Sequence, residues 1–345
     1  MLPEHGGAIS ADVLDFSANL NPLGMPENIK EALARSVGDW ERYPDPDCAE
    51  LTMRLSERLG VPPEKIVCGN GAADLIYRII GAVSPKRALI AVPCFSEYKK
   101  ALEESGAEVC GYSLSEENGF AAGDDLLNAA AERLNGGDML ILTSPNNPTG
   151  QVISKDILRE LCAVCEKRNI IFLCDECFID LTDNLHSVRE FLNPCVISLS
   201  AFTKTYALAG LRLGYAVFGD ERLSQTVKRR GQFWSVSSPA QTAGTAALDP
   251  VNNDYLERSR RLISNGREFL TKELSALGIK VFPSDANFLL LKSELPLYDI
   301  LSEQGIIIRC CSNFETLNEN YYRIAVRSES ENQRLISALE RGING

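Results

Sequence analysis

"LSAFTKTYALAGLRLGY", residues 199–215, ends an apolar run with a turn that carries one lysine, and an arginine follows eight positions later. Lys204 therefore lies directly after a hydrophobic segment, and Arg212 opens the next one. A lysine in apolar surroundings has a lowered pKa and can attack an aldehyde as a nucleophile. Because a lysine near a loop is more often a solvated surface charge, the rest of the sequence must decide between these interpretations.

Apolar runs and helical patterns alternate through the middle of the chain. The runs span residues 87–93, 138–145, 169–176, 195–202 and 212–219, and amphipathic stretches between them include 96–105 and 154–168. Continuous apolar strands that alternate with helices are typical of a largely parallel sheet covered on both faces. The sequence therefore predicts an α/β fold.

The pattern changes near residue 250, where a long helical region precedes short strand-like segments such as "VFPSDANFLLLK" and "YYRIAVRS". A chain of 345 residues also exceeds the usual size of one domain. We predict an N-terminal segment (1–40) that joins a smaller α+β domain, a large domain (41–248) and the small C-terminal domain itself (249–345).

Composition limits the partners and the compartment. The formal charge of −12 argues against binding to nucleic acid or to an anionic membrane. No apolar run approaches the ~20 residues that span a bilayer, and the N-terminus lacks a signal-peptide pattern, so we expect a cytoplasmic protein. Two C-x-x-C pairs, Cys162/Cys165 and Cys174/Cys177, have spacing and context that favour buried reduced thiols over a zinc site, and we predict no metal.

Side chains suited to ligand binding follow the predicted strands. Phe95, Asn147, Asp175 and Lys204 each lie just beyond the end of an apolar run. In open α/β sheets, ligands bind in the crevice outside the carboxyl ends of the strands. An acid in such a crevice either pairs with a cation or keeps a ligand nitrogen protonated.

A second feature suits an anion. "IVCGNGAADLIYRII", residues 66–80, has the pattern of a strand, a Gly-Asn-Gly turn and a helix. The free N–H groups of Gly71, Ala72 and Ala73 at the helix start would form an anion site. Taken alone, this segment would be interpreted as an ordinary turn between a strand and a helix.

In this order, "SPNNPTG", "DE" and "TKTYALAGLRLGY" resemble the fold-type I pyridoxal-phosphate enzymes of the aminotransferase class I/II family. The resemblance implies a mostly parallel seven-stranded sheet, a smaller α+β domain and pyridoxal 5′-phosphate as cofactor. Lys204 would hold the cofactor as an imine, while Asp175 would bind the ring nitrogen and Asn147 the ring oxygen. Arg212 and the backbone of residues 71–73 would hold the phosphate.

Other cofactor contacts follow from the same resemblance. Phe95 would stack on the ring. At Ala201, where relatives often have a hydroxyl that touches the cofactor phosphate, either Thr203 or Ser200 would supply it instead or the contact would be missing. Tyr43, in "ERYPDPD" (41–47), would reach the cofactor phosphate of a second subunit, which implies a homodimer with a shared active site. An ordinary proline-rich turn with a buried tyrosine is the alternative.

The C-terminal segment 305–328 is similar to the histidinol-phosphate aminotransferase branch, where Arg323 would bind the substrate carboxylate and Arg309 a substrate phosphate. Structural salt bridges are the competing explanation, chiefly for Arg327. Within this branch, "EHGG" (4–7) and "DFSANLNPLGMP" (15–26) look more like the threonine-phosphate decarboxylases of the cobalamin pathway.

That resemblance makes His5 and Asn19 substrate contacts, and Phe178 stands where aminotransferases usually have a tyrosine. It implies a phosphorylated amino acid as substrate and decarboxylation of L-threonine O-3-phosphate. A histidinol-phosphate or related aminotransferase that uses 2-oxoglutarate is the alternative. A non-catalytic cofactor-binding module is disfavoured, because Lys204, Asp175 and Arg212 are all present.

Overall fold

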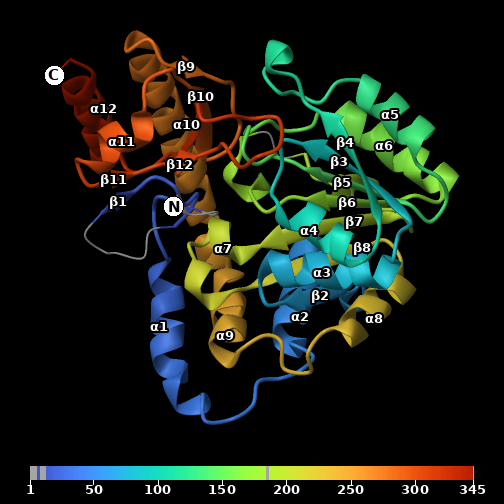
Figure 1. The fold of residues 1–345 in the computed structure, drawn as a ribbon. Coiled ribbons are helices and arrows are strands. Elements are labelled where there is room, and N and C mark those ends of the chain that lie inside the picture. Colours follow the sequence, from blue (N-terminus) through green and yellow to red (C-terminus); the bar gives the residue numbers. More distant parts are fainter. Residues whose placement is uncertain (1–5, 8–12, 184–185, 345) are drawn as a thin grey trace.

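A seven-stranded sheet forms the centre of the molecule in the computed structural model, which describes residues 6–7, 13–183 and 186–344 (Figure 1). In spatial order the strands are β2 (Ile66–Gly69), β8 (Gly214–Phe218), β7 (Val196–Ala201), β6 (Ile171–Asp175), β5 (Met139–Thr143), β3 (Arg87–Val92) and β4 (Glu108–Ser113). Strand β8 runs antiparallel to β2 and β7, and the other neighbours are parallel. The predicted mostly parallel seven-stranded sheet is confirmed.

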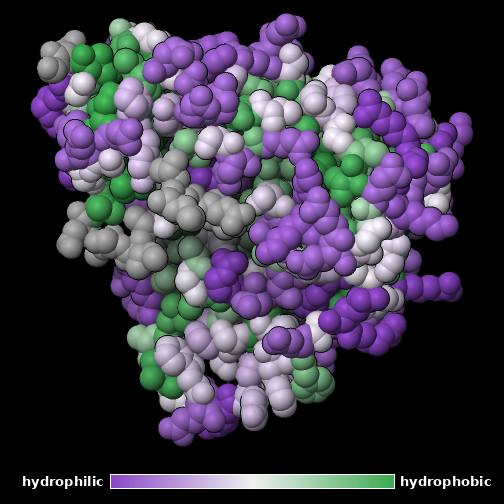
Figure 2. Space-filling view, in the orientation of Figure 1, coloured by the Kyte–Doolittle hydropathy of each residue, from purple (hydrophilic) through white to green (hydrophobic). Residues whose placement is uncertain are grey.

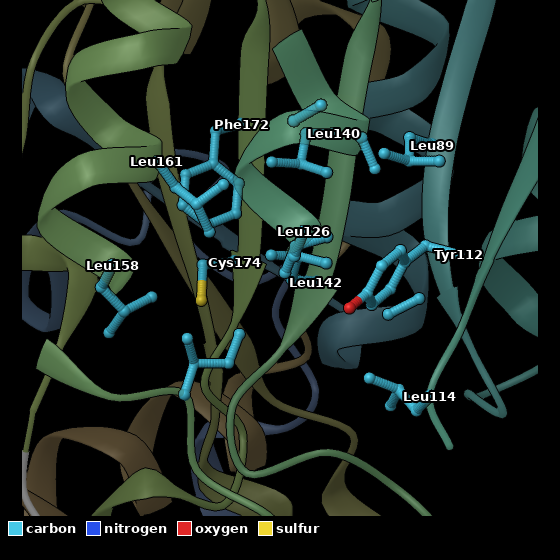
Figure 3. Packing of buried hydrophobic residues seen from close by; sticks show 14 of the residues in the cluster. Leu89, Tyr112, Leu114, Leu126, Leu140, Leu142, Leu158, Leu161, Phe172 and Cys174 are labelled. Carbon is cyan, nitrogen blue, oxygen red and sulfur yellow. The ribbon is translucent and has the colours of Figure 1, made fainter. Parts of the chain in front are cut away.

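Helices cover both faces of this sheet, which explains the continuous apolar runs. Successive strand side chains point to opposite faces, so Leu140 and Leu142 pack in one cluster and Met139 and Ile141 in another. Helices α5 (Asp125–Arg133) and α6 (Lys155–Arg168) cover the first face, and α3 (Gly71–Val83) and α4 (Glu97–Glu104) cover the second. Figure 3 shows the side of the core that α6 closes.

The remaining helices of this part are α1 (Glu27–Ser36), α2 (Ala49–Leu59), α7 (Phe202–Thr205), α8 (Glu221–Arg230) and α9 (Ser238–Ala247). Helices α1, α2 and α9 pack in a third cluster with β2 and β8, and α8 packs against α3. Helix α1 packs along α9 (Figure 1). Helix α7 is a single turn directly after β7, and it carries Lys204.

A smaller antiparallel sheet packs with the C-terminal helices. Its strands, in spatial order, are β12 (Arg309–Cys310), β13 (Tyr321–Ala325), β10 (Phe288–Lys292) and β9 (Lys280–Val281). The helices are α10 (Asn253–Ala276), α11 (Leu297–Ser302) and α12 (Glu329–Asn344). Strand β1 (Leu14–Asp15) pairs in parallel with β11 (Ile306–Ile307), and Phe16 is buried in the core of this part. The domain boundaries at 40/41 and 248/249 stay predictions.

The chain as a whole has a mean hydropathy of −0.09. On the face shown in Figure 2, apolar side chains form small groups among hydrophilic ones. Within the described ranges, no helix is both long and apolar enough to cross a membrane.

Candidate active site

A cavity of about 270 Å³ lies at the carboxyl ends of β5, β6 and β7, between the large sheet and the small one. Eleven of the side chains that the sequence indicated as site residues line it: Asn19, Ala72, Ala73, Phe95, Asn147, Asp175, Thr203, Lys204, Arg212, Arg309 and Arg323. The crevice position was expected for an open α/β sheet, because parallel strands end at one edge. His5 lies outside the described residues.

Lys204 is held on the short α7 turn by the N-terminal loop. The backbone N–H of Asn21 donates to the Lys204 carbonyl at 3.1 Å, and the Asn21 amide donates to the Thr205 carbonyl at 2.8 Å. The Lys204 Nζ lies 5.8 Å from the centre of the Phe178 ring. Burial, together with the charges of Arg323 and Arg212, lowers the pKa of Lys204 to about 8. About half of this amine is therefore unprotonated at pH 8, whereas an ordinary lysine remains almost fully charged there.

Asp175 ends β6 and is 5% exposed. Burial raises the pKa of its carboxyl, while hydrogen bonds from Cys177 and Tyr98 and the charge of Lys204 oppose that shift. The Cys177 N–H donates to Oδ1 at 2.8 Å, and the Tyr98 hydroxyl donates to Oδ2 at 2.5 Å. Sequence reasoning missed Tyr98. The available signal was its place in "FSEY", three residues after Phe95 and thus one helical turn away.

The part of the cavity where Arg212 meets the start of α3 requires glycine at two positions, 71 and 214. Gly71 has a φ of +82°, and a Cβ there would lie 2.7 Å from Nη2 of Arg212. At Gly214 a Cβ would lie 2.6 Å from the backbone nitrogen of Ala72. These two glycines let the Arg212 guanidinium lie against the start of α3. The helix start and the cation together favour an anion at this point.

The hydroxyl of either Ser200 or Thr203 was expected near the cofactor phosphate. The structure places only one of these residues in the cavity wall. The Ser200 hydroxyl accepts a hydrogen bond from Arg189 at 3.3 Å, and Ser200 is absent from the cavity wall. Thr203 belongs to that wall. The geometry therefore favours Thr203 as the hydroxyl that meets a ligand.

The small sheet supplies two arginines to the same cavity. Arg309 and Arg323 are register partners on β12 and β13, and each is 6% exposed. Arg323 donates to the Asn147 side-chain oxygen and, at 2.8 Å, to the Ser17 carbonyl. Arg309 donates to the Cys310 carbonyl at 2.7 Å and to the Asn313 side chain at 2.6 Å. Burial and the charge of Arg309 lower the pKa of Arg323 to about 10.

The predicted residue Tyr43 lies away from the cavity, and so does Arg327, for which the sequence suggested a salt bridge. Arg327 pairs with Glu331 at 2.7 Å and donates to the Asp15 carbonyl at 2.9 Å, so it has a structural role. Tyr43 is 77% exposed and stacks on Trp234, with 4.2 Å between ring centroids. In this chain it therefore faces outward and does not line its own cavity.

The cysteines form no comparable site. All eleven are unpaired, and Cys162 and Cys165 lie on the buried face of α6. Among the described residues no group of three His, Cys, Asp or Glu side chains could hold a metal ion.

A family model described as aminotransferase class I and II matches residues 11–339, so the chain belongs to this family of pyridoxal-phosphate-dependent enzymes. Threonine-phosphate decarboxylase of Salmonella typhimurium is 37% identical, over 98% of this chain and 93% of that protein. Histidinol-phosphate aminotransferase 1 of Cupriavidus pinatubonensis is 31% identical, over 98% and 90%. The crystal structure of the Clostridium acetobutylicum histidinol-phosphate aminotransferase superposes with a TM-score of 0.88 at 28% identity, covering 96% of this chain and 99% of that one.

The cavity fits the family's cofactor. Lys204 offers an amine of lowered pKa for an aldehyde, and Asp175 offers a buried carboxylate for a ring nitrogen. Arg212 and the start of α3 offer a cradle for a phosphate, which a Cβ at Gly71 would fill. In the described part of the chain, Nε of Arg323 and Oδ1 of Asn19 are buried without a hydrogen-bond partner, as expected of groups that await a ligand.

Proposed function

We propose that this chain uses pyridoxal 5′-phosphate to decarboxylate L-threonine O-3-phosphate to (R)-1-aminopropan-2-yl phosphate. The similarity to the Salmonella typhimurium decarboxylase supports this proposal, since its identity exceeds that to the aminotransferase relative. The observation that carries it is the pair Arg309 and Arg323. Two buried guanidinium groups at facing positions of one sheet repel each other, and a substrate with both a carboxylate and a phosphate would relieve this repulsion.

When bound, the cofactor supplies an electron sink for the pair left behind when a bond to the substrate α-carbon breaks. Asp175 would keep the ring nitrogen protonated, because a buried carboxylate stabilises a positive charge beside it. Lys204, once the substrate amine has displaced it, is free to deliver a proton to the α-carbon that has lost carbon dioxide. Arg323 would hold the leaving carboxylate and Arg309 the phosphate, so the two cations fix how the substrate lies.

Phe178 supports decarboxylation over amino transfer. It is 6% exposed, packs edge to face on Phe288 with centroids 5.0 Å apart, and places an apolar ring beside Lys204. Without a hydroxyl there, Asn147 remains the polar side chain expected at the ring oxygen. The fold itself does not discriminate between decarboxylation and amino transfer, because the Clostridium acetobutylicum aminotransferase has a similar architecture.

The two reactions give different products. Purified protein with pyridoxal 5′-phosphate should release carbon dioxide from L-threonine O-3-phosphate without forming glutamate when 2-oxoglutarate is present. Lys204→Ala should lower this rate by ~10³-fold or more, because the attacking amine is removed. Glutamate formation from histidinol phosphate would instead favour the aminotransferase.

We also propose a homodimer in the cytoplasm. The exposed Tyr43–Trp234 stack supports a second subunit, because large aromatic rings are enriched where two proteins meet. The eleven unpaired thiols suit a reducing compartment.

A further inference from the structure

Tyr98 is a buried tyrosine that none of the roles above includes. It lies in the first turn of α4 and is 1% exposed. Its hydroxyl donates to Oδ2 of Asp175 at 2.5 Å, and the N–H of Cys177 donates to Oδ1 at 2.8 Å. The Cys177 side chain also hydrogen-bonds to Asp175. Because an ionised carboxylate has about four acceptor sites, these three donors leave one for a ligand.

The direction of the Tyr98 hydrogen bond is fixed by its surroundings. Burial and the charge of Asp175 raise the pKa of Tyr98 well above its usual value of 10, so the hydroxyl keeps its proton. The Thr143 hydroxyl lies 3.5 Å from the Tyr98 oxygen and donates toward it. The Tyr98 proton therefore points to the carboxylate.

Tyr98 is also held in place by packing. Its ring meets that of Phe95 edge to face, with centroids 5.9 Å apart and an interplanar angle of 83°. Both residues line the cavity, and Tyr98 belongs to the core cluster between α4 and the sheet. The segment at the start of α4 thus supplies an aromatic ring to the cavity wall, from Phe95, and a hydrogen bond to Asp175, from Tyr98.

We propose that Tyr98 is a positioning residue that acts through Asp175: its hydroxyl orients the carboxylate and keeps it ionised, so that the remaining acceptor site can take the N–H of the cofactor ring. A buried carboxylate with fewer donors takes up a proton more readily, and a protonated acid cannot stabilise a charged ring nitrogen. The inference rests on the proposed binding of pyridoxal 5′-phosphate in this cavity. It does not depend on which bond of the substrate is then broken.

Binding of two ring analogues tests this role. Pyridoxine 5′-phosphate has no aldehyde, so its affinity reports on the ring and phosphate contacts without attachment to Lys204. Tyr98→Phe should weaken its binding about tenfold or more, the range for a hydrogen bond to a charged group. An analogue in which C–H replaces the ring nitrogen should bind both proteins equally.

A spectroscopic measurement reports on the ring nitrogen directly. With ¹⁵N-labelled pyridoxine 5′-phosphate bound, the nitrogen resonance should move toward that of neutral pyridine in Tyr98→Phe. In an Asp175→Asn background, adding Tyr98→Phe should change neither affinity nor resonance, because the residue through which Tyr98 acts is gone.

Tyr112→Phe is the matched control. It removes the hydroxyl of another buried tyrosine, one that is hydrogen-bonded to Asp125, and Tyr112 packs in the core cluster on the opposite face of the sheet from Tyr98 (Figure 3). The affinity of Tyr112→Phe for pyridoxine 5′-phosphate and the ¹⁵N resonance of the bound ligand should both match those of the parent protein.

Equal loss of affinity for both analogues would show that Tyr98 acts by packing alone, and an unchanged ¹⁵N resonance would also overturn the inference. If the parent protein bound neither analogue, the proposal that pyridoxal 5′-phosphate binds in this cavity would be overturned as well. Catalysis of amino transfer instead of decarboxylation would overturn the proposed function and leave the Tyr98 result unaffected.

Discussion

The reactivity of Lys204 is set by its neighbours as much as by its own chemistry. The side chain lies in a cavity that also holds Arg323 and Arg212, and it faces the apolar ring of Phe178. Desolvation disfavours its charged form, and nearby cations add to the effect. The same local charges that attract an anionic substrate therefore also prepare the amine for attack.

This coupling predicts a pH dependence. The rate at which apoprotein attaches pyridoxal 5′-phosphate should rise with pH and reach half its plateau near pH 8, since the neutral amine is the nucleophile and its pKa is about 8. In Arg323→Gln one repelling cation is lost, so the pKa should rise and the midpoint should move to higher pH by about one unit. Stopped-flow absorbance measures both profiles. Arg327→Gln, which alters an arginine outside the cavity, should keep the parent midpoint, and an unmoved midpoint in Arg323→Gln would contradict the coupling.

At the residue scale the sequence predicted which side chains meet but not every contact among them. Asn147, Asp175 and Lys204 each follow an apolar run, so their shared edge could be expected. Tyr98 could not, because its partner Asp175 is 77 residues away and no periodic pattern links the two. The sequence could not decide whether Ser200 or Thr203 lies at the cavity, because the hydrogen bond that holds Ser200 comes from Arg189, whose position only the structure shows.

The start of α3 shows how one element controls an anion site. Because Gly71 has a positive φ and its Cα lies against Arg212, a side chain there is disfavoured by both backbone and space.

Gly71→Ala should therefore displace the Arg212 guanidinium and weaken pyridoxal 5′-phosphate binding about tenfold or more, from a strain of about 1–2 kcal/mol together with the lost contact. Equilibrium titration of apoprotein gives the dissociation constant. Gly38→Ala, where an added Cβ has open space and the φ is not positive, is the control and should bind as the parent does. Parent-like affinity in Gly71→Ala would show that the close approach is unimportant.

The strands of the small sheet were predicted less well than those of the large one. The apolar run "GIIIRCC" (305–311) divides into β11 and β12, which belong to different sheets. Ile306 pairs with Leu14, whereas Arg309 pairs with Arg323. Parallel strands buried on both faces give long apolar runs, but two-residue strands leave no comparable pattern.

Across the whole molecule, a charged cluster joins the large sheet region to the small sheet. Glu116 pairs with Lys280 at 2.6 Å and with Lys292 at 3.0 Å, and it also accepts a hydrogen bond from Tyr321. These hydrogen bonds lower the pKa of Glu116 to about 2. The ionised form therefore favours the folded state.

Glu116→Gln should lower the free energy of unfolding by about 1–2 kcal/mol at pH 7, a value discounted for partial exposure. Since the pKa falls from 4.5 in the unfolded chain to about 2 in the folded one, the contribution is complete above 4.5 and is lost as pH falls toward 2. Urea unfolding of parent and variant should therefore converge over this window. Glu117→Gln, at an exposed neighbouring position, should change little at any pH.

The shared active site can be tested by mixing inactive chains. Lys204→Ala and Tyr43→Ala should each lose activity, and subunit exchange should restore about a quarter of the parent's sites, because half of the dimers are hybrids with one intact site. Turnover after mixing measures this. Mixing Lys204→Ala with a Lys204→Ala, Tyr43→Ala double variant should restore none. Absence of recovery in the first mixture would place Tyr43 outside the partner's site.

The pairing of β1 with β11 has a consequence for synthesis on the ribosome. Ile306 is made roughly 15 to 60 s after its partner Leu14 at ~5–20 residues per second. Until Leu270 is made, the adjacent Phe16 has none of the C-terminal residues of its core cluster to pack against. The nascent chain thus carries Phe16 without its native packing partners for most of that interval, and a chaperone that binds apolar segments would shield it during this time.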